Sequence, residues 1–332
     1  MSVKRALAVT GISQQVVAII TLCKTVVVSR VLTPEEVGVY ALAMAFLFFV
    51  QNMRLFGCYE YTLAEKDLTN DKMRACFSIV LTSSAIFLVL FLLGADIAAN
   101  FFDAPGLGDV LRILSISFLV NCLSIFTVTL LNRDMRFAEL AVIQISAAAL
   151  DLAVVIPLAI NGFGANSLAW GFVAASLLTL AITIVYSRQG LIYRPTLRGW
   201  RPILRFGLFA TLSNILFELG FQAPALILGK GMNSSAVGYF TRGQAPITYF
   251  RAGVNGAIGR VAHAWYADTS RNREEMLSQN FMRSVNLIAA LSWPFSVVLF
   301  FHAQTIIELI FGPQWSQSVP IARGLALGSA AS

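Results

Sequence analysis

The sequence has little charge for its length. Of its 332 residues, 12% are Asp, Glu, Lys or Arg, whereas soluble domains average about 25%. Hydrophobic residues make up 57% of the chain, and its mean hydropathy is +0.74. A water-soluble fold of this size needs more polar surface than that, so the composition excludes a soluble globular protein and indicates one embedded in a membrane.

Reactive residues are scarce as well. The four cysteines have no CxxC or metal-ligand spacing, so they indicate neither a disulfide framework nor a zinc site, and we expect them to be packing residues. The only histidines are His263 and His302, and no GxxxxGKS or GxxxxGKT nucleotide loop occurs. Together with the lack of paired carboxylates, this argues against an ATP-driven pump and against an enzyme, and we expect no cofactor and no metal.

Long apolar segments are what the sequence has in abundance. A spanning helix needs about 20 mostly apolar residues, and the chain contains nine complete segments of this kind and one partial segment. They cover residues 8–30, 37–57, 75–95, 112–131, 140–160, 165–186, 205–229, 236–258, 284–307 and the chain from about 319. The sequence therefore predicts an all-α polytopic membrane protein.

The distribution of positive charge predicts an orientation. The net charge is +7, but its Lys and Arg lie in short connections, which does not predict nucleic-acid binding. Seventeen of the 24 lie at the amino terminus or in alternate connections. The positive-inside rule places those segments, and the amino terminus with them, in the cytoplasm.

Two stretches 200 residues apart share one pattern. SRVLTPEEVGVYALA begins at Ser29, and GKGMNSSAVGYFTRG begins at Gly229. The pairs Ser13-Gln14 and Ser213-Asn214, and the later stretches IAANFFD and IIELIFG, extend the match over three helices in the same order. Six spans separate the copies, so both have the same orientation, which predicts a parallel internal repeat of the kind found in transporters.

The local chemistry of the repeat predicts helix starts and a close contact. Thr33 with Glu36 forms a capping box around Pro34, and Asn233 can cap the equivalent helix of the second copy. Gly38 and Gly238 then fall one turn into their helices. Because glycine has no side chain, we expect two membrane helices to approach closely there.

These residues carry a family resemblance. SRVLTPEEVGVYALA, FFDAPGLGDVLRIL, LIFGPQW and the repeat resemble the polysaccharide transporter branch of the multidrug, oligosaccharidyl-lipid and polysaccharide exporter superfamily. The resemblance implies twelve to fourteen helices in two six-helix lobes around a central cavity, here residues 1–190 and an incomplete lobe at 191–332. Because the chain stops inside its tenth helix, we expect either a fragment or a natural truncation.

The resemblance also implies a function. Members flip undecaprenyl-pyrophosphate-linked glycans across the bacterial inner membrane for lipopolysaccharide or exopolysaccharide biosynthesis. The implied partners are the lipid-linked oligosaccharide, membrane lipid, and a polysaccharide polymerase with its chain-length proteins. Two alternatives stay open: an integral-membrane glycan polymerase or ligase, which would need an acid or base platform on its outer face, and a cation-coupled drug exporter, which would want an acidic cavity.

Polar stripes on the predicted helices suggest where a substrate binds. Gln244, Thr248, Arg251 and Asn255 share one face of the eighth segment, and Lys24 lies in the first. Ionisable groups at membrane depth usually face a bundle interior or a wet cavity, and Arg and Lys bind phosphate strongly. The predicted substrate-binding residues are Lys24, Arg54, Gln244, Arg251 and Asn255.

Acidic residues suggest a site for a coupling ion. Glu218 lies in a stripe with Asn214 and Gln222 on the seventh segment, and Asp151 lies in the fifth. Each can bind a coupling cation or serve as the counter-ion of Arg251 or Lys24, and the neutral polar residues can be interhelical hydrogen bonds. Arg242 lies 180° from Arg251 on an ideal helix and is expected near the outer interface.

Overall fold

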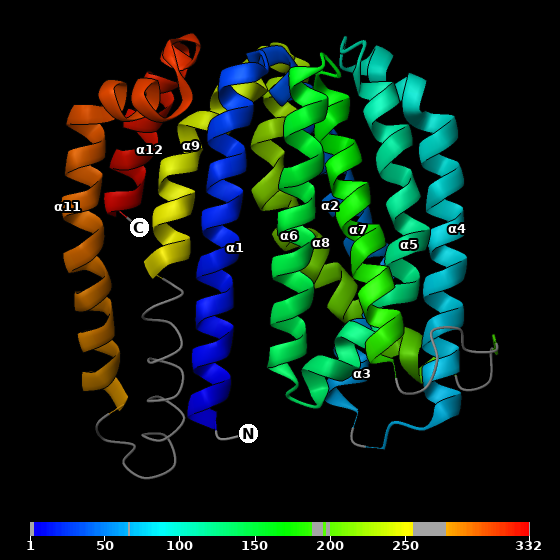
Figure 1. Cartoon of the computed structure of the whole chain (residues 1–332). Helices are drawn as coiled ribbons and strands as arrows, with labels where there is room; N and C mark the ends of the chain where they lie inside the picture. The colour runs from blue at the N-terminus through cyan, green and yellow to red at the C-terminus, as the bar shows by residue number, and fades with distance from the viewer. Residues whose placement is uncertain (1–2, 66, 188–194, 197–199, 255–276, 332) are drawn as a thin grey trace. The chain divides into compact units, whose positions relative to one another are not determined.

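The computed structural model describes residues 3–65, 67–187, 195–196, 200–254 and 277–331. These residues are helical and contain no β-strand, which confirms the prediction of an all-α protein (Figure 1). The chain divides into a continuous unit, Val31–Gly238, and a discontinuous unit made of Met1–Arg30 and Tyr239–Ser332. The division into lobes near residue 190 stays a prediction.

Eight of the described helices are long and apolar enough to cross a membrane. In the continuous unit these are α2 (Pro34–Leu55), α4 (Asn70–Phe101), α5 (Leu107–Arg133), α6 (Phe137–Ile160), α7 (Ala165–Tyr186) and α8 (Trp200–Gly231). The other two are α1 (Val3–Val31) and α11 (Leu277–Phe311). The remaining two predicted segments overlap α9 (Ser234–Val254) and α12 (Val319–Ala331), and residues 255–258 of the former lie outside the described residues. Within the described residues, each predicted apolar segment corresponds to a helix.

The predicted start of α2 is confirmed in atomic detail. Glu36 N donates to Thr33 Oγ1 at 3.3 Å, and Thr33 N donates to Glu36 Oε2 at 2.7 Å, so the capping box is closed in both directions. Pro34 occupies the first turn, where its missing N–H costs nothing. Asn233 likewise caps α9, because its Oδ1 accepts from Ala236 N at 2.9 Å. Both copies of the repeat therefore begin a helix as expected.

The short helix α3, Cys58–Ala64, is not predicted by the sequence. Its seven residues carry too little periodicity to be recognised. The chain enters it through Phe56 and Gly57, both with positive φ, which turns the backbone sharply after α2. Glu65 ends α3 and pairs with Lys72 at 3.1 Å, and this contact lowers the pKa of the Glu65 carboxyl.

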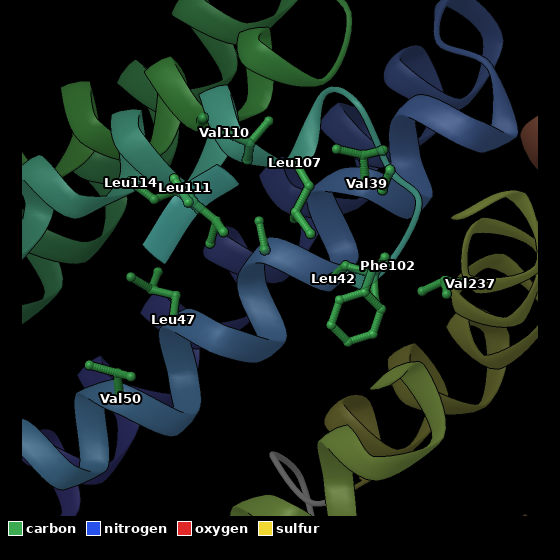
Figure 2. Close-up of a cluster of buried hydrophobic side chains, with 14 of the residues drawn as sticks. Val39, Leu42, Leu47, Val50, Phe102, Leu107, Val110, Leu111, Leu114 and Val237 are labelled. Carbon is green, nitrogen blue, oxygen red and sulfur yellow. The ribbon is translucent and has the colours of Figure 1, made fainter. Parts of the chain in front are cut away.

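One apolar cluster forms the centre of the continuous unit. It joins α2, the end of α4, the start of α5 and the first turn of α9, as Figure 2 shows. The labelled members are Val39, Leu42, Leu47, Val50, Phe102, Leu107, Val110, Leu111, Leu114 and Val237. In a membrane, burial of such side chains stabilises the helix bundle through close packing and not through exclusion of water. This cluster therefore fixes the helix ends where the two repeat stretches lie.

A second cluster contains three of the four cysteines. Cys58, Cys76 and Cys122 are buried against Phe77 and Phe126, where α3, α4 and α5 meet. This agrees with the expectation that they are packing residues. Cys23 on α1 differs, because its side chain is exposed.

The discontinuous unit has a core of its own. Ile247 of α9, Leu299 of α11 and Ala326 of α12 are buried together. The rings of Phe250 and Phe295 stack with centroids 3.9 Å apart, which holds α9 against α11. The six-residue turn η3, Pro313–Ser318, joins α11 to α12. These contacts position the polar residues of α9.

Candidate functional site

The two glycines of the repeat lie against each other's helices. A Cβ at Gly38 would collide with the carbonyl group of Ser234, and a Cβ at Gly238 would collide with the carbonyl group of Pro34. Gly38 and Pro34 differ from Gly238 and Ser234 by 200 positions each, so the contact is reciprocal. The expected close approach is confirmed, and the first turns of α2 and α9 are related by a local two-fold axis.

The predicted stripe on α8 is held by side-chain hydrogen bonds. Gln222 Nε2 donates to Glu218 Oε1 at 2.8 Å, one turn away on the same helix. Asn214 Nδ2 donates to Glu60 Oε1 at 2.9 Å, which ties α8 to α3. The sequence does not single out Glu60, because α3 itself is not predicted. Two carboxylates therefore lie beside each other's helices here, Glu218 on α8 and Glu60 on α3, and both are half-buried.

Asp151 lies inside the continuous unit. Its side chain faces α7 at Gly171, where a Cβ would collide with Asp151 Oδ1 and with a methyl group of Val155. Glycine at position 171 therefore makes room for a carboxylate between α6 and α7. The role of Asp151 in ion coupling stays a prediction.

Lys24 lies beside the contact between α1 and α9. The neighbouring residue, Thr25, accepts a hydrogen bond on Oγ1 from the hydroxyl of Tyr249 at 2.8 Å. Lys24 is half-buried and, on an ideal helix, points about 100° away from Thr25. The contact thus fixes the side of α1 on which Lys24 projects.

The predicted stripe on α9 is polar and accessible at its end. Gln244 is half-buried, and Thr248 and Arg251 are exposed. Arg251 lies about 160° around an ideal helix from Tyr249, so the contact with α1 does not bring Arg251 toward Lys24. Asn255 lies outside the described residues. The prediction that these residues share one cavity therefore stays a prediction.

Arg54 is enclosed by the helices of the continuous unit. Its side chain is 1% exposed, and Nη1 donates to Ser84 Oγ and to the carbonyl oxygen of Phe118, each at 2.9 Å. The guanidinium carbon lies 5.9 Å from the centre of the Phe118 ring. No carboxylate lies within ion-pair distance among the described residues, and Nε makes no hydrogen bond. In this structure Arg54 joins α2 to α4 and α5, and its role in substrate binding stays a prediction.

Arg242 is buried, although the sequence places it near an interface. Its guanidinium lies over two rings, 5.8 Å from the centre of Phe311 and 5.3 Å from that of Trp315. Trp315 Nε1 in turn donates to the carbonyl oxygen of Ser29 at 2.7 Å. This arrangement explains the LIFGPQW stretch, because its two aromatic rings make cation–π contacts with the buried Arg242 guanidinium. Gly312, with φ +109°, makes the turn between the two aromatic residues.

The fold and its repeat define the class of protein: it is a multi-pass helical membrane protein that contains two related stretches. The sequence model of a family described as "Polysaccharide biosynthesis protein" matches residues 27–320. That range covers most of the chain, so the protein belongs to this family.

Curated relatives match nearly the whole chain at low identity. The teichuronic acid biosynthesis protein TuaB of Bacillus subtilis is 22% identical over 338 residues, covering 96% of this chain and 66% of its own length. The succinoglycan biosynthesis transport protein ExoT of Rhizobium meliloti is 25% identical, with coverage of 91% and 61%. The lipopolysaccharide biosynthesis protein WzxC of Escherichia coli is 19% identical, with coverage of 92% and 62%. The chain thus spans just under two thirds of the length of these relatives.

Solved structures show the same fold. The lipid II flippase MurJ, in an inward closed conformation, is 16% identical with a TM-score of 0.76, covering 97% of this chain and 72% of the other. An inward-facing multidrug resistance transporter of the MATE family is 13% identical with a TM-score of 0.60, covering 96% and 81%. These likenesses concern the fold alone.

Proposed function

We propose that this protein is a secondary transporter that moves a lipid-linked oligosaccharide across the cytoplasmic membrane by alternating access. The observation that carries the proposal is the fold, which matches a lipid flippase over 97% of the chain. The family of polysaccharide biosynthesis proteins supplies the class of cargo. The reciprocal contact of Gly38 and Gly238 supports a transporter built from a repeat.

The substrate's pyrophosphate needs positive charge within the membrane. Lys24 and Arg251 are the cations that we assign to it, with Gln244 and Asn255 as neutral donors from the same face as Arg251. Charge-assisted hydrogen bonds to phosphate are short and roughly twice as strong as neutral ones. Arg54 completes the set only in a conformation that exposes it, because the side chain is enclosed here.

Glu218 and Asp151 are the proposed sites of a coupling cation. Asp151 sits beside Gly171 within the continuous unit, and Glu218 is hydrogen bonded by Gln222. A carboxylate at membrane depth is costly unless it is paired or lies beside water. Binding of a proton or sodium ion would lower this cost, which is the physical basis for coupling.

The proposed setting is a bacterial inner membrane with the amino terminus in the cytoplasm. In this orientation the turn after α6, at Gly162, faces outward, and Thr196 lies inside. A cysteine introduced at Gly162, in a background without the native cysteines, should react with an impermeant thiol reagent in intact cells. A cysteine at Thr196 should react only after lysis. Labelling in the reverse pattern would invert the topology.

The cargo is tested by lipid analysis of a strain that lacks the protein. If the protein is a flippase, the lipid-linked oligosaccharide accumulates on the cytoplasmic leaflet, where an impermeant glycan-modifying reagent does not reach it. If the protein is instead a polymerase or ligase, single oligosaccharide units accumulate on the outer leaflet. Unchanged glycan lipids together with a new sensitivity to cationic drugs would favour a drug exporter.

We also propose the glycan polymerase and chain-length proteins as functional partners, because they would act on the lipid-linked oligosaccharide that this protein is proposed to move.

A further inference from the structure

A polar cavity lies at one end of the continuous unit, and none of its lining residues is among those assigned to transport. Its volume is about 380 Å³, and it lies between the start of α4, the end of α5, the start of α6 and the end of α7. The polar side chains that line it are Asn70, Arg133, Asp134, Arg136, Tyr186 and Ser187. The positive-inside rule predicts that this end faces the cytoplasm.

Most of the polar side chains in this cavity are hydrogen-bond donors with capacity to spare. Arg136 donates through Nε to Glu139 at 3.0 Å, while its Nη groups donate to none of the described residues. The side chains of Asn70, Tyr186 and Ser187 likewise make no hydrogen bond within the part of the chain that the structure describes, although each has a donor. Four donor-bearing residues therefore converge on one space.

The charges of the lining favour an anion. Among the lining residues, Arg133 and Arg136 contribute two positive charges and Asp134 one negative charge, which leaves a net charge of +1. Glu139, which pairs with Arg136, is not part of the lining. Asp134 is exposed, so its charge is screened by solvent. Arg133 is held in place because Nη1 donates to the carbonyl oxygen of Thr62 at 2.5 Å. A ligand with several anionic oxygens matches both the donors and the charge.

Part of the cavity lining is apolar, which argues for a lipid over a soluble anion. Leu68, Met73, Leu130 and Leu131 form this part. The cavity lies where four candidate spans begin or end, at the depth at which lipid headgroups meet the ends of spanning helices. Tyr186 at such a place is typical of the aromatic belt at a membrane interface.

We propose that this cavity binds the phosphate headgroup of an anionic phospholipid, with Arg136, Tyr186, Ser187 and Asn70 donating to its oxygens. The acyl chains would lie along the apolar residues of the lining. Such a lipid would join the ends of α4, α5, α6 and α7. The proposal needs only that these helices cross a membrane, so it stands or falls separately from the transported substrate.

The test measures lipid binding to the purified protein by native mass spectrometry, with phosphatidylglycerol, phosphatidylcholine and inorganic phosphate as probes. Phosphatidylglycerol should bind at least about tenfold more tightly than phosphatidylcholine. Arg136→Gln should weaken its binding by about tenfold, as expected when a charge-assisted hydrogen bond is lost. Inorganic phosphate at the same concentration should not compete.

A matched control separates binding from structure, because Arg136 also pairs with Glu139. Glu139→Gln removes the same ion pair but keeps the arginine, so phosphatidylglycerol should bind as tightly as before or more tightly. Tyr186→Phe, which removes one donor at constant shape, should weaken binding about threefold to tenfold. The proposal is overturned if Arg136→Gln and Glu139→Gln lower binding equally, if both lipids bind alike, or if inorganic phosphate displaces the lipid.

Discussion

Gly38 and Gly238, 200 positions apart, each occupy the space beside a backbone carbonyl of the other's helix. The partner carbonyls, those of Ser234 and Pro34, are also 200 positions apart. A contact that repeats itself in this way is expected at a two-fold axis, where each helix presents the same surface to the other. The first turns of α2 and α9 therefore act as one symmetric joint, and its tightness depends on two missing side chains.

Adding a methyl group at this joint should destabilise the protein. Gly38→Ala or Gly238→Ala places a Cβ against a carbonyl group that cannot rotate away, and overpacking of this kind costs about 1–3 kcal/mol. Gly220→Ala on α8 is the matched control, because a Cβ there meets no atom within 4 Å. Thermal unfolding in detergent should show a lower midpoint for the first two variants and no decrease for the third. Equal midpoints for all three would refute the contact.

Removing the charge of Arg54 should separate packing from function. Arg54→Met keeps most of the volume and removes a buried cation that has no carboxylate beside it, so its stability should lie within about 1 kcal/mol of the parent protein. Arg54→Ala leaves a cavity and should cost about 2–4 kcal/mol. If Arg54 also binds substrate, as the sequence predicts, the Met variant is stable but transports poorly. Normal transport by the Met variant would limit Arg54 to packing.

Trp315 should stabilise the discontinuous unit in two ways, through its ring and through its hydrogen bond to Ser29. Trp315→Phe keeps a ring beneath Arg242 but loses the N–H donor, which should cost about 1 kcal/mol. Trp315→Leu loses both and should cost more. Trp293→Phe serves as the control, since Trp293 is 62% exposed. Equal unfolding midpoints for Trp315→Phe and Trp293→Phe would show that the hydrogen bond contributes nothing.

The thiols of Cys58 and Cys76 should be close enough to link. Both are buried in the same cluster, where α3 and α4 meet. With diamide as oxidant, the two thiols lose two protons and two electrons, the azo group is reduced to a hydrazine, and a disulfide forms. Peptide mapping should find Cys58 joined to Cys76 and Cys122 still free. A Cys58–Cys122 link in its place would contradict the expected pairing, because it would show that the Cys58 thiol reaches Cys122 of α5 more readily than Cys76 of α4.

Local patterns in the sequence predict the local parts of the structure. The capping box at Thr33 and Glu36 needs only four consecutive residues, and the glycines of the repeat are recognised by their spacing of 200. Both are confirmed. The cation–π contacts of Arg242 are not predicted by any local pattern. Phe311 and Trp315 lie about 70 residues further along the chain, and nothing near Arg242 in the sequence indicates aromatic partners.

The candidate site shows the same division between local and distant contacts. Helical spacing places Glu218 and Gln222 on one face, and the structure joins them. The contact of Asn214 with Glu60 depends on the short helix α3, which has too few residues to show a period. Whether residues from separate helices converge on one substrate depends on packing between helices, which spacing along one helix does not determine. The convergence of Lys24 and Arg251 on one substrate therefore remains a prediction.

Charge at Arg251 is the property that the proposed pyrophosphate site requires. Arg251→Lys should retain part of the transport, because lysine keeps the charge but lacks the planar fork of donors. Arg251→Ala should lose most of it, and Arg251→Glu should abolish it at unchanged abundance in the membrane. If Arg251→Glu is rescued by Glu218→Arg or by Asp151→Arg, Arg251 belongs to a structural ion pair and not to the substrate site.

The most direct test of the transport proposal is a flipping assay in proteoliposomes. Purified protein is reconstituted with a fluorescent undecaprenyl-pyrophosphate-linked oligosaccharide, and an impermeant reagent reports how much of it reaches the outer leaflet. The account predicts that the lipid crosses at a rate proportional to the amount of protein, and that Arg251→Glu reduces this rate to that of empty liposomes. Transfer no faster than in empty liposomes, from protein shown to be folded, would contradict it.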